Sequence, residues 1–129
     1  VDVNMFKTIL RNLISNAIKF QHVHEAHPRL EMHIEVDKTR GVFTFKDNGI
    51  GIPKENLTKV FDMFFRAPGN AADGSGLGLY IVKEIVRKMK GKIFLNMIYC
   101  IMISGYDDQY CVKIQISSRL NCQHQEFRC

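Results

Sequence analysis

The sequence contains no tryptophan, only three prolines, and no cysteine before position 100. Its four cysteines stand at positions 100, 111, 122 and 129, so no two have the close spacing of a zinc-binding CxxC pair. His124 lies near Cys122, but one such pair does not make a metal site. We therefore expect four free thiols, as in a cytosolic protein, rather than a structural zinc site.

Long hydrophobic runs are also missing. The apolar stretch Ile98–Ile103 is far shorter than the roughly 18 residues that a transmembrane helix needs. The first residues lack the basic and then apolar pattern of a signal peptide, and there is no initiator methionine. We expect a cytoplasmic, monomeric chain without membrane contact, excised from a parent protein that can itself be membrane-anchored.

Strong charge of one sign is absent as well. Lysine and arginine total 18 against 13 acidic residues, a net charge of +5. This modest excess suits an anionic ligand, but composition alone favours the alternative, a solvated mixed surface. No dense basic block with interleaved aromatic residues occurs, so we do not expect a nucleic-acid partner.

Hydrophobic periodicity predicts alternating helices and strands in a chain long enough for one domain. A helix is expected over 4–20 with Asn4 as its N-cap, and a second over 77–90, stopped by Gly91. A short helix is expected over 53–62, with Pro53 at its first position. The expected strands are 30–36, 42–47, 92–103 and 110–117, and the first of them is expected to be half-buried. Hairpins are expected to join the first two strands and the last two. The predicted fold class is α+β, with helices layered on a mixed, mainly antiparallel sheet.

The first predicted helix carries a polar stripe beside its apolar face. Asn12, Asn16 and Lys19 are spaced by four and three residues, so they share one side of the helix. An asparagine oxygen is a hard ligand suited to Mg²⁺, and a nearby lysine can neutralise phosphate charge. The alternative is a set of solvent-facing polar residues without a ligand.

The stretch DNGIGIP follows the strand expected over 42–47. Asp47 ends that strand, where its carboxylate can accept a hydrogen bond from an exocyclic amine. Gly49 and Gly51 allow a backbone to approach a ligand closely. The alternative is a tight turn after a strand, for which this composition is common.

The stretch GSGLGL, residues 74–79, precedes the second long predicted helix. Unpaired amides at a helix N-terminus form an anion site. The spacing matches neither the dinucleotide-binding fingerprint nor the P-loop, so the pattern predicts phosphate binding outside those two folds. The loop over 64–76 is rich in Gly, Ala, Pro, Asn and Asp, and we expect it to form a lid.

Taken together in chain order, these motifs resemble the ATP-binding catalytic domain of sensor histidine kinases, in the GHKL ATPase superfamily. The resemblance runs from about residue 4 to 93 and rests on four boxes: the N box (Asn12, Asn16, Lys19, Phe20), the G1 box (Asp47, Gly49, Gly51), the F box (Phe61, Phe64, Phe65, Arg66) and the G2 box (Gly74, Gly76, Gly78).

This resemblance implies a Bergerat-type two-layer α/β sandwich that binds ATP and Mg²⁺. It implies that Asp47 binds the adenine amino group, with Gly49, Gly51, Ile52 and Phe20 beside the base. It implies that Asn16 holds Mg²⁺, with Asn12 one turn away. The residues that it places at the phosphates and lid are Lys19, Phe64, Arg66, Gly74, Gly76, Leu77, Gly78 and Leu79. Asn12, Lys19 and Arg66 are its expected catalytic residues.

One position discriminates between activities within that superfamily. Its ATP-hydrolysing members resemble one another in a glutamate that activates water, and Asn12 stands at that place here. An amide cannot act as a general base at neutral pH, so the expected reaction is phosphoryl transfer to a protein histidine. The alternative is a non-catalytic nucleotide-binding remnant or interaction module with the same fold.

Two parts of the family pattern are missing from this sequence. No phosphoacceptor motif of the type SHELRxP occurs, so the resemblance implies a separate His-bearing dimerisation domain and a response regulator as partners. The loop histidines 22, 24 and 27 are expected to be solvated rather than to form a metal site. The C-terminal region lacks the usual glycine-threonine motif. We therefore expect a catalytic core over 1–96 and an atypical segment over 97–129, made of a last strand and a disordered, Cys-rich tail.

Overall fold

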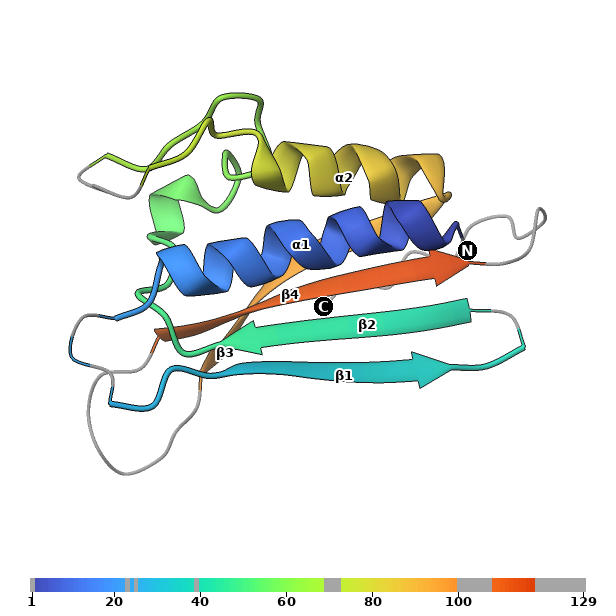
Figure 1. The fold of residues 1–129 in the computed structure, drawn as a ribbon, viewed down its shortest axis with the longest axis horizontal. Helices are drawn as coiled ribbons and strands as arrows, with labels where there is room; N and C mark the ends of the chain where they lie inside the picture. Colours follow the sequence, from blue (N-terminus) through green and yellow to red (C-terminus); the bar gives the residue numbers. More distant parts are fainter. Residues whose placement is uncertain are drawn as a thin grey trace.

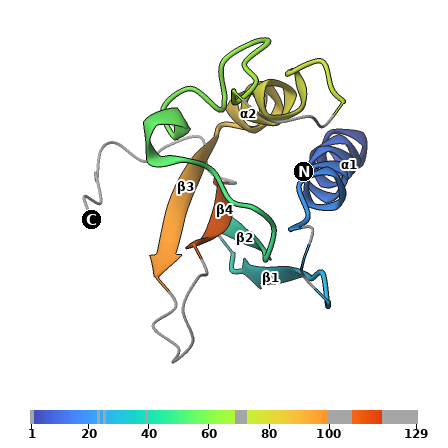
Figure 2. The ribbon, with the colours of Figure 1, turned by 90° about the vertical axis from the view of Figure 1, so that its left-hand side faces the viewer.

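The computed structural model describes residues 2–22, 24, 26–38, 40–68, 73–99 and 108–117, with 96–99 and 108–117 described by their backbone alone. Two α-helices lie side by side across one face of a four-stranded sheet (Figures 1 and 2). The elements are α1 (Val3–Lys19), β1 (Leu30–Val36), β2 (Arg40–Asp47), the 3-10 turn η1 (Lys54–Asn56), α2 (Gly78–Lys88), β3 (Gly91–Tyr99) and β4 (Asp108–Ser117). The predicted sandwich, with helices on one face of the sheet, is confirmed.

The sheet has the strand order β1-β2-β4-β3, and all three pairings are antiparallel. The expected pairing of β1 with β2 is present, with Leu30 opposite Asp47 and Val36 opposite Gly41. The pairing of β3 with β4 is also present. The sequence did not reveal that β4 lies between β2 and β3. The expected boundary after residue 96 falls inside β3, and the division into a core and a tail stays a prediction.

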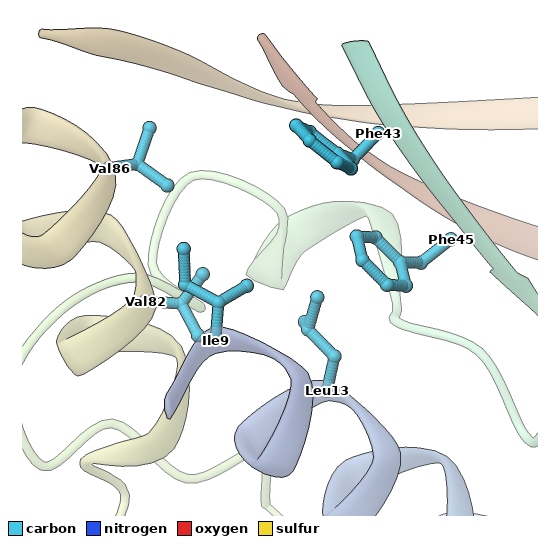
Figure 3. Packing of buried hydrophobic residues seen from close by; sticks show 6 residues of the cluster. All are labelled: Ile9, Leu13, Phe43, Phe45, Val82 and Val86. Atoms are coloured by element: carbon cyan, nitrogen blue, oxygen red, sulfur yellow. The ribbon is translucent and has the colours of Figure 1, made fainter. Parts of the chain in front are cut away.

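The core lies between the two helices and β2. Alternation along β2 directs Phe43 and Phe45 to the helical side, where they meet apolar residues of both helices. Burying a side chain of this size stabilises the fold by about 1.5–3 kcal/mol. Figure 3 shows the six buried side chains of this cluster: Ile9, Leu13, Phe43, Phe45, Val82 and Val86.

The start of α1 differs from the prediction by two residues. The N-cap is Asp2, whose Oδ1 accepts from the backbone N–H groups of Asn4 at 2.8 Å and Met5 at 3.1 Å. Asn4 is therefore inside the helix, because the carboxylate of Asp2 already satisfies the free amides of the first turn. The other end closes at Phe20, whose N–H donates to the carbonyl of Asn16 at 2.9 Å.

Two further helix predictions need correction. The segment 53–62 forms only the short turn η1 and irregular turns, because its backbone bonds mix three- and four-residue spacings and no α-helix propagates. α2 ends before Gly91, which begins β3 instead. Lys90 takes the left-handed position after the helix, with φ of 54°, and its N–H donates to the Arg87 carbonyl at 3.0 Å.

The prediction that β1 is half-buried is wrong, because all seven of its residues are exposed. The strand lies at the edge of the sheet, and the buried helical contacts end one strand further in, at Phe43 and Phe45 of β2. Neither described helix has the length and hydropathy needed to cross a bilayer.

Candidate functional site

Three elements end together at one end of the sandwich, on the left in Figure 1. They are the C-terminal end of α1, the end of β2 and the N-terminal end of α2. A cavity of about 480 Å³ opens there, within the usual range of roughly 300–1,000 Å³ for small-molecule sites. Its position follows from the topology, because the polar ends of these elements converge beside the apolar core.

Most of the residues predicted from the four motifs line this one cavity. They are Asn12, Asn16, Lys19, Phe20, Asp47, Gly51, Ile52, Phe65, Arg66, Gly74, Gly76, Gly78 and Leu79. The motifs are separated by up to several dozen residues in the sequence, so the fold is what brings them together. The role of each residue remains a prediction.

The turn after β2 is fastened to the end of α1. Oδ1 of Asp47 accepts from the Gly49 N–H at 2.9 Å, and the Ile50 N–H donates to the carbonyl of Phe20 at 2.9 Å. Gly49 does not line the cavity but makes this contact sterically feasible, because a Cβ there would overlap the Phe20 carbonyl oxygen. One oxygen of Asp47 thus holds the turn.

We expect Gly49→Ala to lower the free energy of unfolding by about 2 kcal/mol or more, because backbone on both sides must move to admit a methyl group. Thermal denaturation of the full chain measures the loss. Gly74→Ala is the matched control, since a Cβ at Gly74 would meet only the Lys19 Nζ, at an ordinary 3.8 Å. Equal melting temperatures for the two variants would contradict the assignment of Gly49 to this contact.

The asparagines of α1 lie against the first turn of α2. The Asn12 Nδ2 donates to the Thr8 carbonyl at 2.8 Å, which fixes the side chain. A Cβ at Gly78 would stand 3.2 Å from Oδ1 of Asn12 and 3.7 Å from Oδ1 of Asn16. Gly78 therefore leaves room for two amide oxygens at the N-terminus of α2.

Positive charge gathers beside the glycine-rich loop. The Lys19 ammonium lies next to Gly74, and Arg66 lines the same cavity. The α2 N-cap is Leu77, whose side chain makes no capping hydrogen bond, so the first amides of the helix have no partner from the cap. This part of the cavity is suited to an anion, although Asp73 also lines it.

Four residues named from the motifs do not line the cavity: Gly49, Phe61, Phe64 and Leu77. Phe64 has a positive φ of 62° and a side chain that is 65% exposed, whereas the neighbouring Phe65 lines the cavity. The sequence FF does not reveal which ring faces inward, because the left-handed backbone at Phe64 is set by the fold. Of the expected lid, residues 69–72 lie outside the residues that the structure describes.

The motifs account for only part of the cavity wall. Phe65 belongs to the F box, and Ala67, Pro68, Asp73 and Ser75 belong to the loop that is expected to form a lid. The lining residues without a predicted site role are Leu13, Ser15, Leu30, Phe45, Ile50, Pro53, Val60 and Leu95. Phe45 had a usable signal, because it stands two residues before Asp47 on the same strand face. Leu95 comes from β3 and had none.

Among the residues that the structure describes, no group of three or more His, Cys, Asp or Glu side chains is arranged to hold a metal ion. The side-chain oxygens that line the cavity include those of Asn12, Asn16, Asp47 and Asp73.

Comparison with known proteins gives consistent matches. A family model described as histidine kinase-, DNA gyrase B-, and HSP90-like ATPase matches residues 1–119. The chain is 36% identical over 103 residues to sensor protein kinase WalK of Staphylococcus haemolyticus. The matched region covers 76% of this chain and 16% of that protein. It thus spans about a sixth of the length of the curated relatives first matched.

Solved structures show the same fold. The mycobacterial sensor histidine kinase MprB superposes with a TM-score of 0.74 at 25% identity, over 91% of this chain and 72% of that one. Full-length ShkA, solved in complex with AMPPNP, superposes with a TM-score of 0.68 at 21% identity, over 90% of this chain and 22% of that one.

Proposed function

The chain belongs to the histidine kinase-, DNA gyrase B- and HSP90-like ATPase family, and on that basis we propose that it binds ATP and Mg²⁺ as the catalytic domain of a two-component sensor histidine kinase. The chain resembles sensor kinases in both sequence and fold. The observation that carries the proposal is the single cavity lined by residues of all four motifs.

In this proposal the adenine base lies at the end of β2. Phe45 and Leu95 supply apolar wall, and Asp47 supplies a carboxylate at its edge. Because one oxygen of Asp47 holds the turn through Gly49, the other is available to accept from the exocyclic amine of adenine. Gly51, Ile52 and Phe20 also line the cavity and would contact the ring.

The phosphates would extend toward α2. The free amides at the start of that helix and the helix dipole favour an anion there. Lys19 and Arg66 would neutralise the negative charge on the phosphate oxygens during transfer of the phosphoryl group. The residues of the stretch 74–79 that would surround the phosphates are Gly74, Gly76, Leu77, Gly78 and Leu79.

The donor set fits Mg²⁺ bound together with phosphates. Amide oxygens of Asn16 and Asn12 lie beside Gly78, and this cation usually takes one or two protein ligands and keeps water and phosphate oxygens for the rest. We assign Asn16 as its ligand and Asn12 to position it. When bound, the ion neutralises charge on the phosphate oxygens.

The reaction that follows is transfer of the γ-phosphoryl group to an imidazole nitrogen of a histidine on a separate dimerisation domain. The bond between the γ-phosphorus and the bridging oxygen of ADP breaks, a nitrogen–phosphorus bond forms, and the imidazole releases a proton. The chain contributes position and charge neutralisation, as phosphoryl transfer generally requires. Asn12 offers no general base, so attack by water is disfavoured. A response regulator would then receive the phosphoryl group.

Calorimetric titration of the full chain with ATP, with and without Mg²⁺, tests the binding step. Addition of a His-bearing dimerisation domain from a related sensor kinase and labelled ATP then tests transfer. Binding followed by phosphorylation of that domain is the expected result. Binding without transfer to any supplied domain would favour a non-catalytic nucleotide-binding module. Steady ATP turnover by the chain alone would instead indicate a hydrolase.

We expect Asn16→Ala to lower the affinity for ATP in the presence of Mg²⁺ by about tenfold or more. The reason is that Mg²⁺ usually takes only one or two protein ligands, and this variant removes one of them. Affinity measured in EDTA should change little. Asn4→Ala on the same helix is the matched control, because Asn4 does not line the cavity. An unchanged ratio of affinities with and without Mg²⁺ would refute the metal assignment.

A further inference from the structure

An exposed apolar stripe runs along β1 beside the buried core residues of β2. Leu30, Met32, Ile34 and Val36 are 36%, 47%, 50% and 71% exposed. A strand with apolar residues at alternate positions normally buries them, since one face of such a strand packs on the core. Large exposed apolar residues in a row mark an interaction surface more often than scattered single ones do.

The register shows which way this stripe points. Met32 lies opposite Phe45 and Ile34 opposite Phe43, and directly opposed residues share a face of the sheet. The stripe therefore lies on the face of the sheet that the helices cover. It is one strand further out than the core residues Phe43 and Phe45 of β2. On that side α1 also has exposed apolar residues, with Ile14 at 43% and Ile18 at 61%.

The outer edge of β1 is open in the part of the chain that the structure describes. β1 pairs with β2 and with no other described strand, so alternate backbone N–H and C=O groups point outward. Such an edge can accept a further strand through main-chain hydrogen bonds, with side-chain contacts supplying specificity. Backbone groups and apolar surface are thus available along the same seven residues.

The opposite face of β1 is acidic. It presents Glu31, His33 and Glu35, all exposed. Glu31 lies across from Lys46 and 3.9 Å from the Nε2 of His33, whereas the residue directly opposite Glu35 is the uncharged Val42. An added strand therefore meets negative charge on this face, most clearly at Glu35.

We propose that β1 is a strand-addition site for an extended segment of another polypeptide in which apolar residues alternate with lysine or arginine. The apolar residues cover the stripe, and the basic residues face Glu31 and Glu35, which are four positions apart. Both requirements follow from the two-residue period of a strand.

A second copy of this chain fits less well. Antiparallel self-pairing that uses all seven residues places Glu31 opposite Glu35 of the second copy and His33 opposite His33. Like charges directly opposite each other destabilise a strand pair. The surface thus favours a basic partner strand over its own copy.

The probe is a nine-residue peptide of alternating valine and lysine, fluorescently labelled, added to the full 129-residue chain. We expect saturable binding, measured by anisotropy. Backbone NMR shifts should be confined to β1 and to its neighbours in β2. A peptide with glutamate in place of lysine should have an affinity at least about tenfold lower, because attraction to the acidic face becomes repulsion.

Variants of the chain locate the site. Ile34→Lys and Glu35→Lys should each weaken binding of the valine-lysine peptide at least about fivefold, one by placing a charge in the stripe and the other by reversing the acidic face. Both residues lie outside the cavity, and circular dichroism checks that the fold is retained. Glu55→Lys makes the same change of charge at an exposed residue of η1 outside the cavity, so it is the control and should leave binding unchanged.

Three results would overturn the proposal. One is equal binding of a peptide that is N-methylated at alternate residues, which lacks the edge-pairing amides. Another is binding that neither β1 variant reduces, and the third is no binding at millimolar peptide. Concentration-dependent self-association that Ile34→Lys abolishes would assign the surface to a second copy instead.

Discussion

Asp47→Asn is expected to weaken ATP binding about a hundredfold while leaving the fold intact, because a charge-assisted acceptor in the cavity is replaced by an amide donor. In the structure, Oδ1 of Asp47 accepts from the Gly49 N–H at 2.9 Å. An asparagine can keep that bond through its own oxygen. Its NH₂ group then takes the place of the second carboxylate oxygen and faces the amine of adenine, donor against donor. Calorimetry with ATP measures the loss, and the melting temperature should change little.

The comparison with Asp47→Ala separates the two duties of this carboxylate. Alanine removes the bond to the turn as well, so it should lower both affinity and melting temperature, whereas asparagine should lower affinity alone. Asp62→Asn is the matched control, because Asp62 is exposed and does not line the cavity. Wild-type ATP affinity in Asp47→Asn would remove the adenine assignment, even if the alanine variant bound poorly.

Sequence reasoning was most successful where a motif lies within one local element. Asn12, Asn16 and Lys19 share a helix face by spacing alone, and the structure places all three at the cavity. Asp47 and Gly51 lie in one turn and were found for the same reason. Short-range periodicity fixes the relative direction of such side chains before any tertiary contact forms.

Features that depend on long-range packing were not predictable in this way. Phe64 and Phe65 look equivalent in the sequence, yet the φ of 62° at Phe64 turns its ring outward. The alternation of β1 predicts a half-buried strand, but alternation carries no information on whether a partner layer covers that strand. The place of β4 between β2 and β3 is likewise set by pairing between segments far apart in the chain.

Gly76 lies close to the backbone of Phe64 and Phe65, which begin the loop 64–76. A Cβ at Gly76 would stand 2.7 Å from the Phe64 carbonyl carbon and 2.8 Å from the Phe65 carbonyl oxygen. Gly76 itself has a φ of 72°, a conformation that disfavours any side chain. The residues after Gly76 lead directly into α2, so this contact also sets where the free amides of that helix lie relative to Arg66.

Gly76→Ala is therefore expected to weaken ATP binding by about 30-fold or more, because one left-handed residue with a Cβ and one backbone clash together cost on the order of 2 kcal/mol or more. Adenosine tests where the damage lies. It lacks phosphates and would depend on the Asp47 end of the cavity, so its affinity should fall much less than that of ATP.

Gly74→Ala separates this contact from a general sensitivity of the glycine-rich loop. A Cβ at Gly74 would meet only the Lys19 Nζ at 3.8 Å, so we expect a clearly smaller loss of ATP affinity. Equal losses of ATP and adenosine affinity in Gly76→Ala would mean that the whole cavity has collapsed. A loss confined to ATP would mean that the phosphate end is held by the backbone contact between Gly76 and the Phe64–Phe65 segment. The two glycines would then have different roles. Gly74 tolerates a side chain, whereas Gly76 must lack one because it lies against the backbone of Phe64 and Phe65.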